Sequence, residues 1–492
     1  MIRMDMELLR AKTLQVLQDV GIEVQNEALV KVALQRGCRQ LPTGRIQIPP
    51  ELIEELVACQ EKTRSEDDDD QSLHPFCGID WTHWIMWTGQ KQQMKKRLKT
   101  EFLMSAFDCG PTRYYDYQAG TDKPVDTDIF IEMKKFAQAT PEIGYISTWY
   151  RQDVPEGTER IASLILALRY TDKVDGIEAI NPAVIKYLVE IGEIMSGNPG
   201  DARYLAGSEC LISPLILEKR SADDMVERER VGVREYHMAS MPTMGVNFPV
   251  TPAGAVVMSA AETLGGMAVA YCLDPEGDIT GRMISTYMDM RTADTTAANP
   301  ESIIVDLAVK QLFDECFGGH LWTEVFFSPS AREPGLLATY QNFYGAAGRA
   351  SLTGDAKTPY PGMGTLHNGA LGSPTQFMLD MEIRKSQFFM KDEIAVNEDT
   401  VPYAEMVRRA AAKQPFLDTD HTLTHFRELW NSDLLPLTVP ATAGGIGQEQ
   451  KMLDRCEERW RANVEKWVPP EIDEDKLKAL TKLQERAEKE FL

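Results

Sequence analysis

The chain has 492 residues, of which 43% are hydrophobic and 26% are charged, a composition typical of globular proteins. Its formal net charge of −23 argues against nucleic acid as a partner, because phosphate groups would be repelled. The acidic balance instead favours a cationic small molecule or a basic protein surface as the ligand. The length suits about three ordinary domains or one βα barrel with additions.

Eight cysteines are scattered singly, without a CxxC motif and without histidine at zinc-ligand spacing. Isolated cysteines in a long chain indicate a reducing, intracellular environment. Residues 1–21 form an amphipathic pattern that contains acidic residues, unlike a signal peptide, and no run approaches the length of an apolar membrane span. We therefore expect a cytoplasmic protein.

Residues 1–109 are predicted to form a helical and mixed N-terminal extension. Within 1–62 the pattern is mainly helical, with a short alternating segment and a proline-started helix at 45–57. The acidic run at 65–71 lacks the spacing of a calcium loop and is interpreted as a solvated loop. Trp81, Trp84 and Trp87 are spaced by three, which favours a core or interface stripe; a cage for a cationic ligand is the alternative.

Residues 110–370 alternate between short β-rich segments and helical stretches. The eight predicted strands lie at 114–120, 143–150, 173–180, 202–210, 237–247, 278–288, 320–329 and 348–356. Parallel strands joined by helices, eight times, predict an α/β fold in the form of a TIM-like (β/α)8 barrel. Residues 371–492 are predicted to form a mostly helical C-terminal region.

The stretch at 241–266, MPTMGVNFPVTPAGAVVMSAAETLGG, is predicted to be one βα unit. An apolar segment breaks at Asn247 and Pro252 and continues as a helix rich in Ala, Val and Met. Thr251 precedes Pro252 and is the predicted N-cap. Asn247, Thr251 and Glu262 would lie near the carboxyl end of the strand, where βα folds bind ligands. A tight packing turn is the alternative interpretation.

Aromatic and polar side chains gather at the predicted carboxyl ends of the strands, where a barrel binds its substrate. They are Trp149, Tyr150, Glu178, Ser208, Glu209, Asn247, Thr286, Tyr287, Phe326, Phe327, Ser328, Thr353 and Asp355, followed by His367 and Asn368 in a glycine-rich loop. Aromatic faces with a few carboxylates suit an organic cation, at about 0.5–2 kcal/mol per ring. Packing inside the barrel is the alternative for about half of them, although ionised carboxylates such as Glu178 and Glu209 are rarely buried without a partner.

Several other chemistries lack their motifs. The chain has no GxGxxG sequence, no Walker loop and no GxSxG elbow. HTLTH at 421–425 places His421 and His425 on one helical face, but the glutamate of a metalloprotease is missing between them. We interpret these histidines as packing or capping residues, with a zinc site as the alternative.

The segment GVNFPVTPAGAVVMSAAETLGG within 241–266 resembles a block of the trimethylamine methyltransferase family, whose members are corrinoid-dependent. Further blocks agree in order: YTDKVDG at 170–176, MDMRTADTTAANPE at 288–301, LGSPTQFMLDMEI at 371–383 and HTLTHFRELW at 421–430. The resemblance implies a barrel that transfers a methyl group from a methylated amine to the Co(I) cobalamin of a separate corrinoid protein. The family's GATGP is GVNFP here, which implies a differently shaped pocket.

Family members that act on trimethylamine carry a pyrrolysine in the barrel, whereas this chain contains only the twenty standard residues. The corresponding loop would be SPSAREPG at 328–335. The resemblance therefore implies the pyrrolysine-free branch, typified by a glycine betaine methyltransferase. A quaternary ammonium leaves as a neutral amine, so the reaction needs no general acid and depends on positioning and electrostatics.

The predicted substrate-binding set combines a group for the ammonium with a group for a betaine carboxylate, and no metal ligand is predicted. The set is Trp149, Tyr150, Glu178, Glu209, Asn247 and Phe327, together with Arg332, His367 and Asn368, the last three facing the carboxylate. Two other interpretations stay open: a different barrel enzyme, such as a lyase that uses the carboxylates as bases, and a non-catalytic betaine binder. A homo-oligomer is expected.

Overall fold

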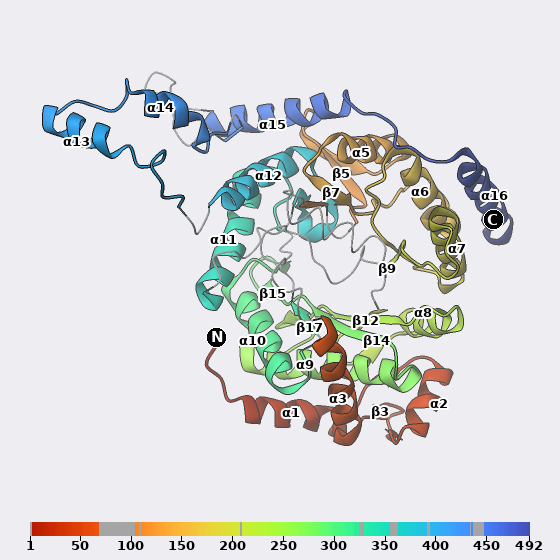
Figure 1. Ribbon diagram of the computed structural model, residues 1–492. Coiled ribbons are helices and arrows are strands. Elements are labelled where there is room, and N and C mark those ends of the chain that lie inside the picture. Colours follow the sequence, from red (N-terminus) through yellow and green to blue (C-terminus); the bar gives the residue numbers. More distant parts are fainter. Residues whose placement is uncertain are drawn as a thin grey trace.

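The computed structural model describes residues 2–67, 104–107, 110–206, 209–319, 321–323, 329–354, 363–390, 394–432, 434–435 and 447–492. Its N-terminal part contains three helices, α1 (Met6–Asp19), α2 (Glu27–Gln35) and α3 (Pro50–Asp67), with short strands between them (Figure 1). Asp5 and Asn26 accept backbone N–H groups at the starts of α1 and α2, as N-caps do. The helices predicted within 1–62 are confirmed, while the tryptophan stripe at 81–87 lies outside the described residues.

Parallel strands alternate with helices through the middle of the chain. The strands are β4 (Met104–Ala106), β7 (Ile143–Ile146), β8 (Ile177–Glu178), β9 (Leu205–Ala206), β10 (Glu209–Cys210), β12 (Glu235–Ser240), β14 (Asp278–Met283) and β17 (Leu321–Thr323). The helices among them are α5 (Thr127–Ala139), α6 (Glu156–Tyr170), α7 (Ile185–Ser196), α8 (Lys219–Arg230), α9 (Pro252–Leu273) and α10 (Pro300–Cys316). This order is that of βα units, because parallel strands need a crossover connection.

The strand pairing confirms the α/β class. One sheet has the parallel order β10-β12-β14-β17, and β4 pairs with β7 and β8 with β9 in parallel. A single parallel bridge joins Ile146, the last residue of β7, to Val174, which lies shortly before β8. The described strands thus form several small sheets and do not close into a ring.

The first predicted strand, at 114–120, differs from the observed elements. The segment at 114–120 contains β5 (Arg113–Asp116), but β5 forms an antiparallel hairpin with β6 (Thr121–Pro124) and pairs in parallel with β19 (Leu371–Gly372). The hairpin turns at Gly120, which has a φ of +64° that glycine adopts readily. The strand that pairs with β7 is instead β4, which precedes the predicted start of the barrel at residue 110.

The prediction of a strand at 348–356 is wrong, because α11 (Leu336–Thr353) continues through most of it. Its helical form is stabilised by tertiary contacts: Arg349 lies on the buried face and forms an ion pair of 3.1 Å with Asp306 of α10. Gly354, with a φ of +75°, ends the helix in the left-handed conformation.

The predicted βα unit at 241–266 is observed in its main features. β12 is followed by a two-residue strand, β13 (Thr243–Met244), and α9 begins at Pro252 with Thr251 as the N-cap. Within the described ranges α9 is the helix long and apolar enough to cross a membrane, but 78% of its 18-residue apolar window is buried inside the fold. Such burial is typical of the core helix of a globular protein.

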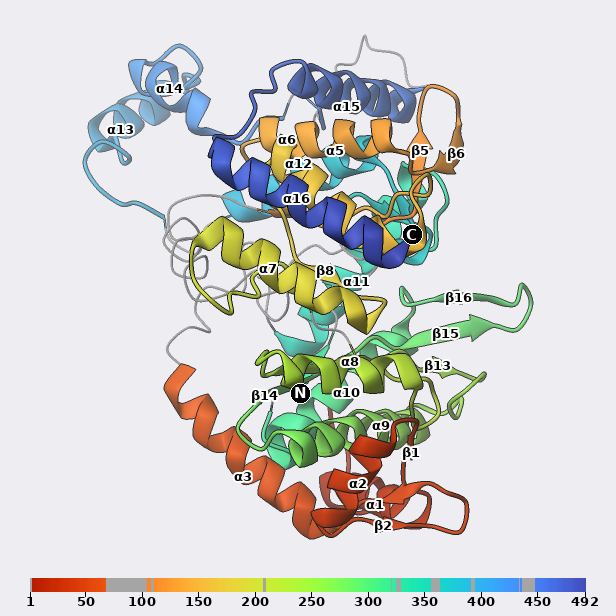
Figure 2. The ribbon, with the colours of Figure 1, turned by 90° about the vertical axis from the view of Figure 1, so that its right-hand side faces the viewer.

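The C-terminal region is helical, as predicted. It contains α12 (Pro374–Phe389), α13 (Tyr403–Ala412), α14 (Asp420–His425), α15 (Gln448–Val464) and α16 (Glu474–Phe491). α15 packs against α5 and α12, and α16 packs across α6 and α7 (Figure 2). Tyr187 donates a hydrogen bond of 2.6 Å to Glu490, so the end of the chain is fastened to α7.

Candidate active site at the strand ends

The side-chain alternation of β12 and β14 separates a core face from a polar face. Met238 faces α9, because a Cβ atom on Gly266 would touch its side chain, and Gly281 likewise faces Met267. His237 and Arg282 therefore point to the opposite face. There the His237 ring nitrogen Nδ1 lies 2.6 Å from Oγ1 of Thr280. Burial, helped by the nearby guanidinium of Arg282, holds the pKa of His237 well below its usual value, so the imidazole is neutral.

Glu178, the last residue of β8, lies in a cluster of guanidinium groups. Burial raises the pKa of this carboxyl group, and the positive charges of Arg220, Arg160 and Arg282 act in the opposite direction. Arg220 is the second residue of α8, Arg160 lies near the start of α6 and Arg282 lies near the end of β14. Glu178 thus lies within electrostatic range of arginines from three other elements, two of which also pair with a glutamate of their own, Arg160 with Glu159 and Arg220 with Glu218.

Tyr150 belongs to the same cluster. The guanidinium carbon of Arg160 lies 3.7 Å from the centroid of the Tyr150 ring, a cation–π contact, and Arg160 also pairs with Glu159. The structure therefore brings together two predicted site residues, Tyr150 and Glu178, through an arginine that the sequence did not single out.

Glu209, in β10, has a different set of polar contacts. Its Oε1 atom is 3.0 Å from Nε of Arg228, and its Oε2 atom accepts the backbone N–H of His237 at 2.5 Å. Both side chains of the ion pair are almost fully buried, and Arg228 also donates to Asp224 at 2.6 Å. These contacts hold β10, β12 and α8 together, so the observed partners of Glu209 are structural.

Trp149 is fully buried in the core. Its ring lies edge-on to Phe107, with 4.9 Å between the centroids, and a Cβ atom on Gly372 would collide with it. The indole nitrogen Nε1 is a buried donor with no hydrogen-bond partner among the described residues. The substrate contact predicted for Trp149 stays a prediction.

The residues predicted to meet a carboxylate form a second cluster. His367 and Asn368 have φ values of 49° and 54°, a left-handed conformation that is strained for histidine. Their backbone N–H groups donate to the carbonyl oxygens of Ala331 and Pro329 at 2.8 and 3.0 Å, which places the loop beside Arg332. Arg332 is 66% exposed and lies 4.0 Å from Asp294.

A small sheet connects this second cluster with the loop of Asn247. The sheet consists of β13, β15 (Thr286–Asp289) and β16 (Asp294–Thr296), and Asn368 donates to the carbonyl of Thr295 at 3.3 Å. Asn247 accepts the backbone N–H of Thr243 at 2.7 Å, which shapes the loop after β13. Asn247 therefore has a clear role in loop structure, and its contact with substrate stays a prediction.

Several predicted strand-end residues cannot be placed in this way. Phe327, together with Ser208, Phe326, Ser328 and Asp355, lies outside the described residues. Thr286 and Tyr287 lie in β15, and Thr353 ends α11.

Arg160, Arg220 and Arg282 are the residues that sequence reasoning missed. A signal was available for Arg282, because it is a charged residue inside the otherwise alternating strand DITGRM and should need a buried partner. For Arg160 and Arg220 the available signal was their position near the starts of helices that follow strands.

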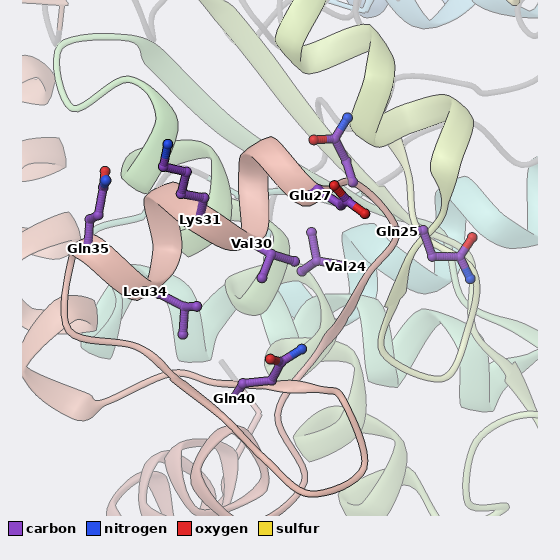
Figure 3. A pocket seen from close by; sticks show the side chains of 9 residues that line it. Val24, Gln25, Glu27, Val30, Lys31, Leu34, Gln35 and Gln40 are labelled. Atoms are coloured by element: carbon purple, nitrogen blue, oxygen red, sulfur yellow. The ribbon is translucent and has the colours of Figure 1, made fainter.

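Two further features lie away from the strand ends. The rings of His421 and His425 lie 4.5 Å apart, and His425 contacts Glu428 and Asp399. Within the described ranges no group of three or more His, Cys, Asp or Glu side chains is arranged to hold a metal ion. A groove of about 640 Å³ runs along α2 between Val24, Val30 and Leu34 (Figure 3), and none of the predicted site residues lines it.

Parallel strands alternating with helices define an α/β protein, and charged side chains at the strand ends lie where enzymes of this class bind their ligands. The chain belongs to the trimethylamine methyltransferase (MTTB) family, whose family profile matches residues 87–491. This match confirms the resemblance drawn from the sequence.

The names of individual relatives mention two different substrates, glycine betaine and trimethylamine. The chain is 23% identical over 338 residues to a glycine betaine methyltransferase of Desulfitobacterium hafniense, a match that covers 65% of this chain and 66% of that protein, just under two thirds. It is 22% identical over 501 residues to trimethylamine methyltransferase MttB1 of Methanosarcina mazei, covering 99% of this chain and 94% of the relative. A trimethylamine methyltransferase of Methanosarcina barkeri is 23% identical over 429 residues, which cover 85% and 81% of the two chains. These relatives support methyl transfer from an amine.

Proposed function

We propose that this chain is a cytoplasmic enzyme that transfers a methyl group from a quaternary amine bearing a carboxylate, such as glycine betaine, to the Co(I) cobalamin of a separate corrinoid protein. We place the reaction at the carboxyl ends of the strands of a (β/α)8 barrel. Membership of the methyltransferase family supports the reaction class, and the charges around Glu178 support the choice of substrate.

The cluster at Glu178 is the observation that carries the proposal. The positive charges of three guanidinium groups act on the Glu178 carboxylate near the strand ends, and two of these groups also pair with glutamates, Arg160 with Glu159 and Arg220 with Glu218. Guanidinium groups bind carboxylates with paired, charge-assisted hydrogen bonds. Trimethylamine and choline have no carboxylate to offer, whereas a betaine presents a carboxylate to the arginines and an ammonium to Glu178.

The proposed reaction requires no side chain that donates a proton to the leaving group. The C–N bond of the donor breaks with its electron pair remaining on nitrogen, so the leaving tertiary amine is neutral and needs no proton. The cobalamin is a substrate carried by the partner protein and supplies the nucleophilic Co(I). The chain's own residues bind the zwitterion, orient one methyl group outward and exclude water, which is catalysis by positioning and electrostatics. The neutral His237 adds no competing positive charge beside the ammonium.

Anaerobic spectroscopy with free Co(I) cobalamin tests the function. The donors are glycine betaine, proline betaine, carnitine, choline and trimethylamine. We expect the Co(I) absorption to be lost with a carboxylate-bearing donor and to persist with choline and trimethylamine. Turnover of a donor without any cobalamin would indicate a different barrel enzyme, and tight binding without turnover would indicate a betaine-binding protein.

Two matched substitutions test whether the substrate carboxylate binds at the Glu178 cluster or at the second cluster, which contains Arg332, His367 and Asn368. Arg282→Gln should raise KM for the betaine by about 10- to 100-fold, because hydrogen bonds to charged groups contribute about 1.5–3 kcal/mol. Arg332→Gln removes the same charge from the exposed second cluster and should change KM by no more than about fivefold, because exposed ion pairs contribute about 0–1 kcal/mol. If Arg332→Gln raised KM more than Arg282→Gln did, the carboxylate site would lie at the loop of His367 and Asn368 instead.

A further inference from the structure

The segment 394–430, here called the arm, protrudes from the body of the protein and buries almost none of its own side chains. It contains α13 and α14, and it extends away from the remaining helices in Figure 1. Thr419 is the only buried residue of the arm. Helices of ten and six residues are marginal in water when they stand alone, so this arm needs a surface to pack against.

The arm carries apolar side chains in the positions that a partner would cover. Tyr403, Met406 and Val407 follow the i, i+3, i+4 spacing of an amphipathic helix, with Arg408 on another side of α13. Eleven large apolar side chains of the arm are exposed: Ile394, Val396, Val401, Tyr403, Met406, Val407, Phe416, Leu417, Leu423, Phe426 and Leu429. Single exposed apolar residues are ordinary, whereas a contiguous set marks an interaction surface.

A second apolar surface lies on α11 and contains no exposed charge. Leu336, Tyr340 and Phe343 form a stripe at helical spacing, and Leu337 and Leu352 are exposed beside it. The one charged residue of this 18-residue helix, Arg349, lies on the opposite, buried face in its ion pair with Asp306. A solvated helix face normally carries charged residues, so this face is built to be covered.

We propose that the partner is a second copy of this chain, with the arm of each protomer packed on the α11 face of the other. The arm and α11 lie on the same side of the molecule, on either side of α12 along the chain (Figure 1). A two-fold axis on that side would cover both surfaces in both copies with one self-complementary contact.

The chemistry of the two surfaces favours a permanent pair of identical chains over a transient partner. Permanent homodimer interfaces are more apolar than transient ones, and a charge-free helix face offers no electrostatic steering to a transient partner. A stable interface needs about 800 Å² from each partner. Sixteen exposed apolar side chains would reach this area at roughly 50 Å² each, well below the ~150–250 Å² that a buried aromatic residue contributes.

Sedimentation of the full-length protein, with one substitution in each surface, tests the proposal. Wild-type protein should sediment at twice the chain mass of 55.3 kDa at micromolar concentration. Leu423→Glu in the arm and Phe343→Glu on α11 should each raise the dimer Kd at least 100-fold, because each buries a carboxylate in an apolar contact. Val468→Glu is the matched control, since Val468 is as exposed as Leu423, at 69%, but lies outside both surfaces. Unchanged circular dichroism and unfolding midpoints would establish that the variants are folded.

Mixing the two variants gives the sharpest outcome. A heterodimer of the Leu423→Glu and Phe343→Glu chains keeps one intact arm and one intact α11 face, so partial association should return. A monomeric wild-type protein would overturn the proposal in favour of a different occupant. Loss of the dimer with the arm variant alone, or a dimer unaffected by either variant, would also overturn it.

Discussion

Replacing Glu209 by glutamine should destabilise the fold without impairing substrate binding. The Glu209 carboxylate and the Arg228 guanidinium are both buried and 3.0 Å apart, and breaking such a pair costs about 3–5 kcal/mol. Glutamine still accepts the His237 N–H through its amide oxygen, and Asp224 still pairs with Arg228 at 2.6 Å. We therefore expect a loss somewhat below this range, about 2–3 kcal/mol in the free energy of unfolding.

Urea unfolding followed by circular dichroism measures that loss, and steady-state methyl transfer at a temperature where the variant is folded gives KM. The matched variant is Glu178→Gln, which should raise KM several-fold and leave the unfolding midpoint nearly unchanged. An unchanged midpoint for Glu209→Gln together with a raised KM would refute this assignment and return Glu209 to the substrate site.

Two further predictions concern buried ionisable groups. Burial lowers the pKa of Lys134 from 10.5 to about 7, so the unfolded chain binds a proton that the folded chain releases between these values, and stability falls as the pH is lowered through that window. Relative to Lys134→Met, the wild-type protein should lose about 3 kcal/mol of unfolding free energy between pH 9.5 and pH 7; a pH-independent difference between the two would contradict this. Glu262 accepts hydrogen bonds from Ser213, Ser240 and the Leu215 N–H at 2.6–2.7 Å. Glu262→Ala should cost about 2 kcal/mol in urea unfolding, because it leaves the buried N–H unpaired, whereas Glu262→Gln should cost less.

The alternation of strands and helices could be predicted from the sequence because it is a local pattern. Apolar runs punctuated by glycine and proline mark β12, α9 and β14 without reference to the rest of the chain. The pattern failed at 348–356, where Arg349 pairs with Asp306 on another helix and tertiary packing selects a helix. It also failed to distinguish the β5–β6 hairpin from a parallel strand, since pairing direction depends on contacts far along the chain.

The candidate site was predictable by residue type more than by location. The sequence correctly indicated that Glu178 and Glu209 need partners, but it could not show that Arg228 of α8 pairs with Glu209 while the charges of three other arginines act on Glu178. Those arginines lie at positions 160, 220 and 282, and only the fold brings them together. Trp149 has the residue type of a cation-binding aromatic, yet the core around Phe107 encloses its ring.

Transfer of an isotopically labelled methyl group tests the central claim most directly. Glycine betaine with deuterated N-methyl groups would be incubated anaerobically with the protein and Co(I) cobalamin, and both products would be measured by mass spectrometry. The account predicts that one deuterated methyl group moves to cobalamin for each dimethylglycine formed, and that choline labelled in the same way transfers none. Unlabelled cobalamin in the presence of a folded, betaine-binding protein, or equal transfer from choline, would contradict it.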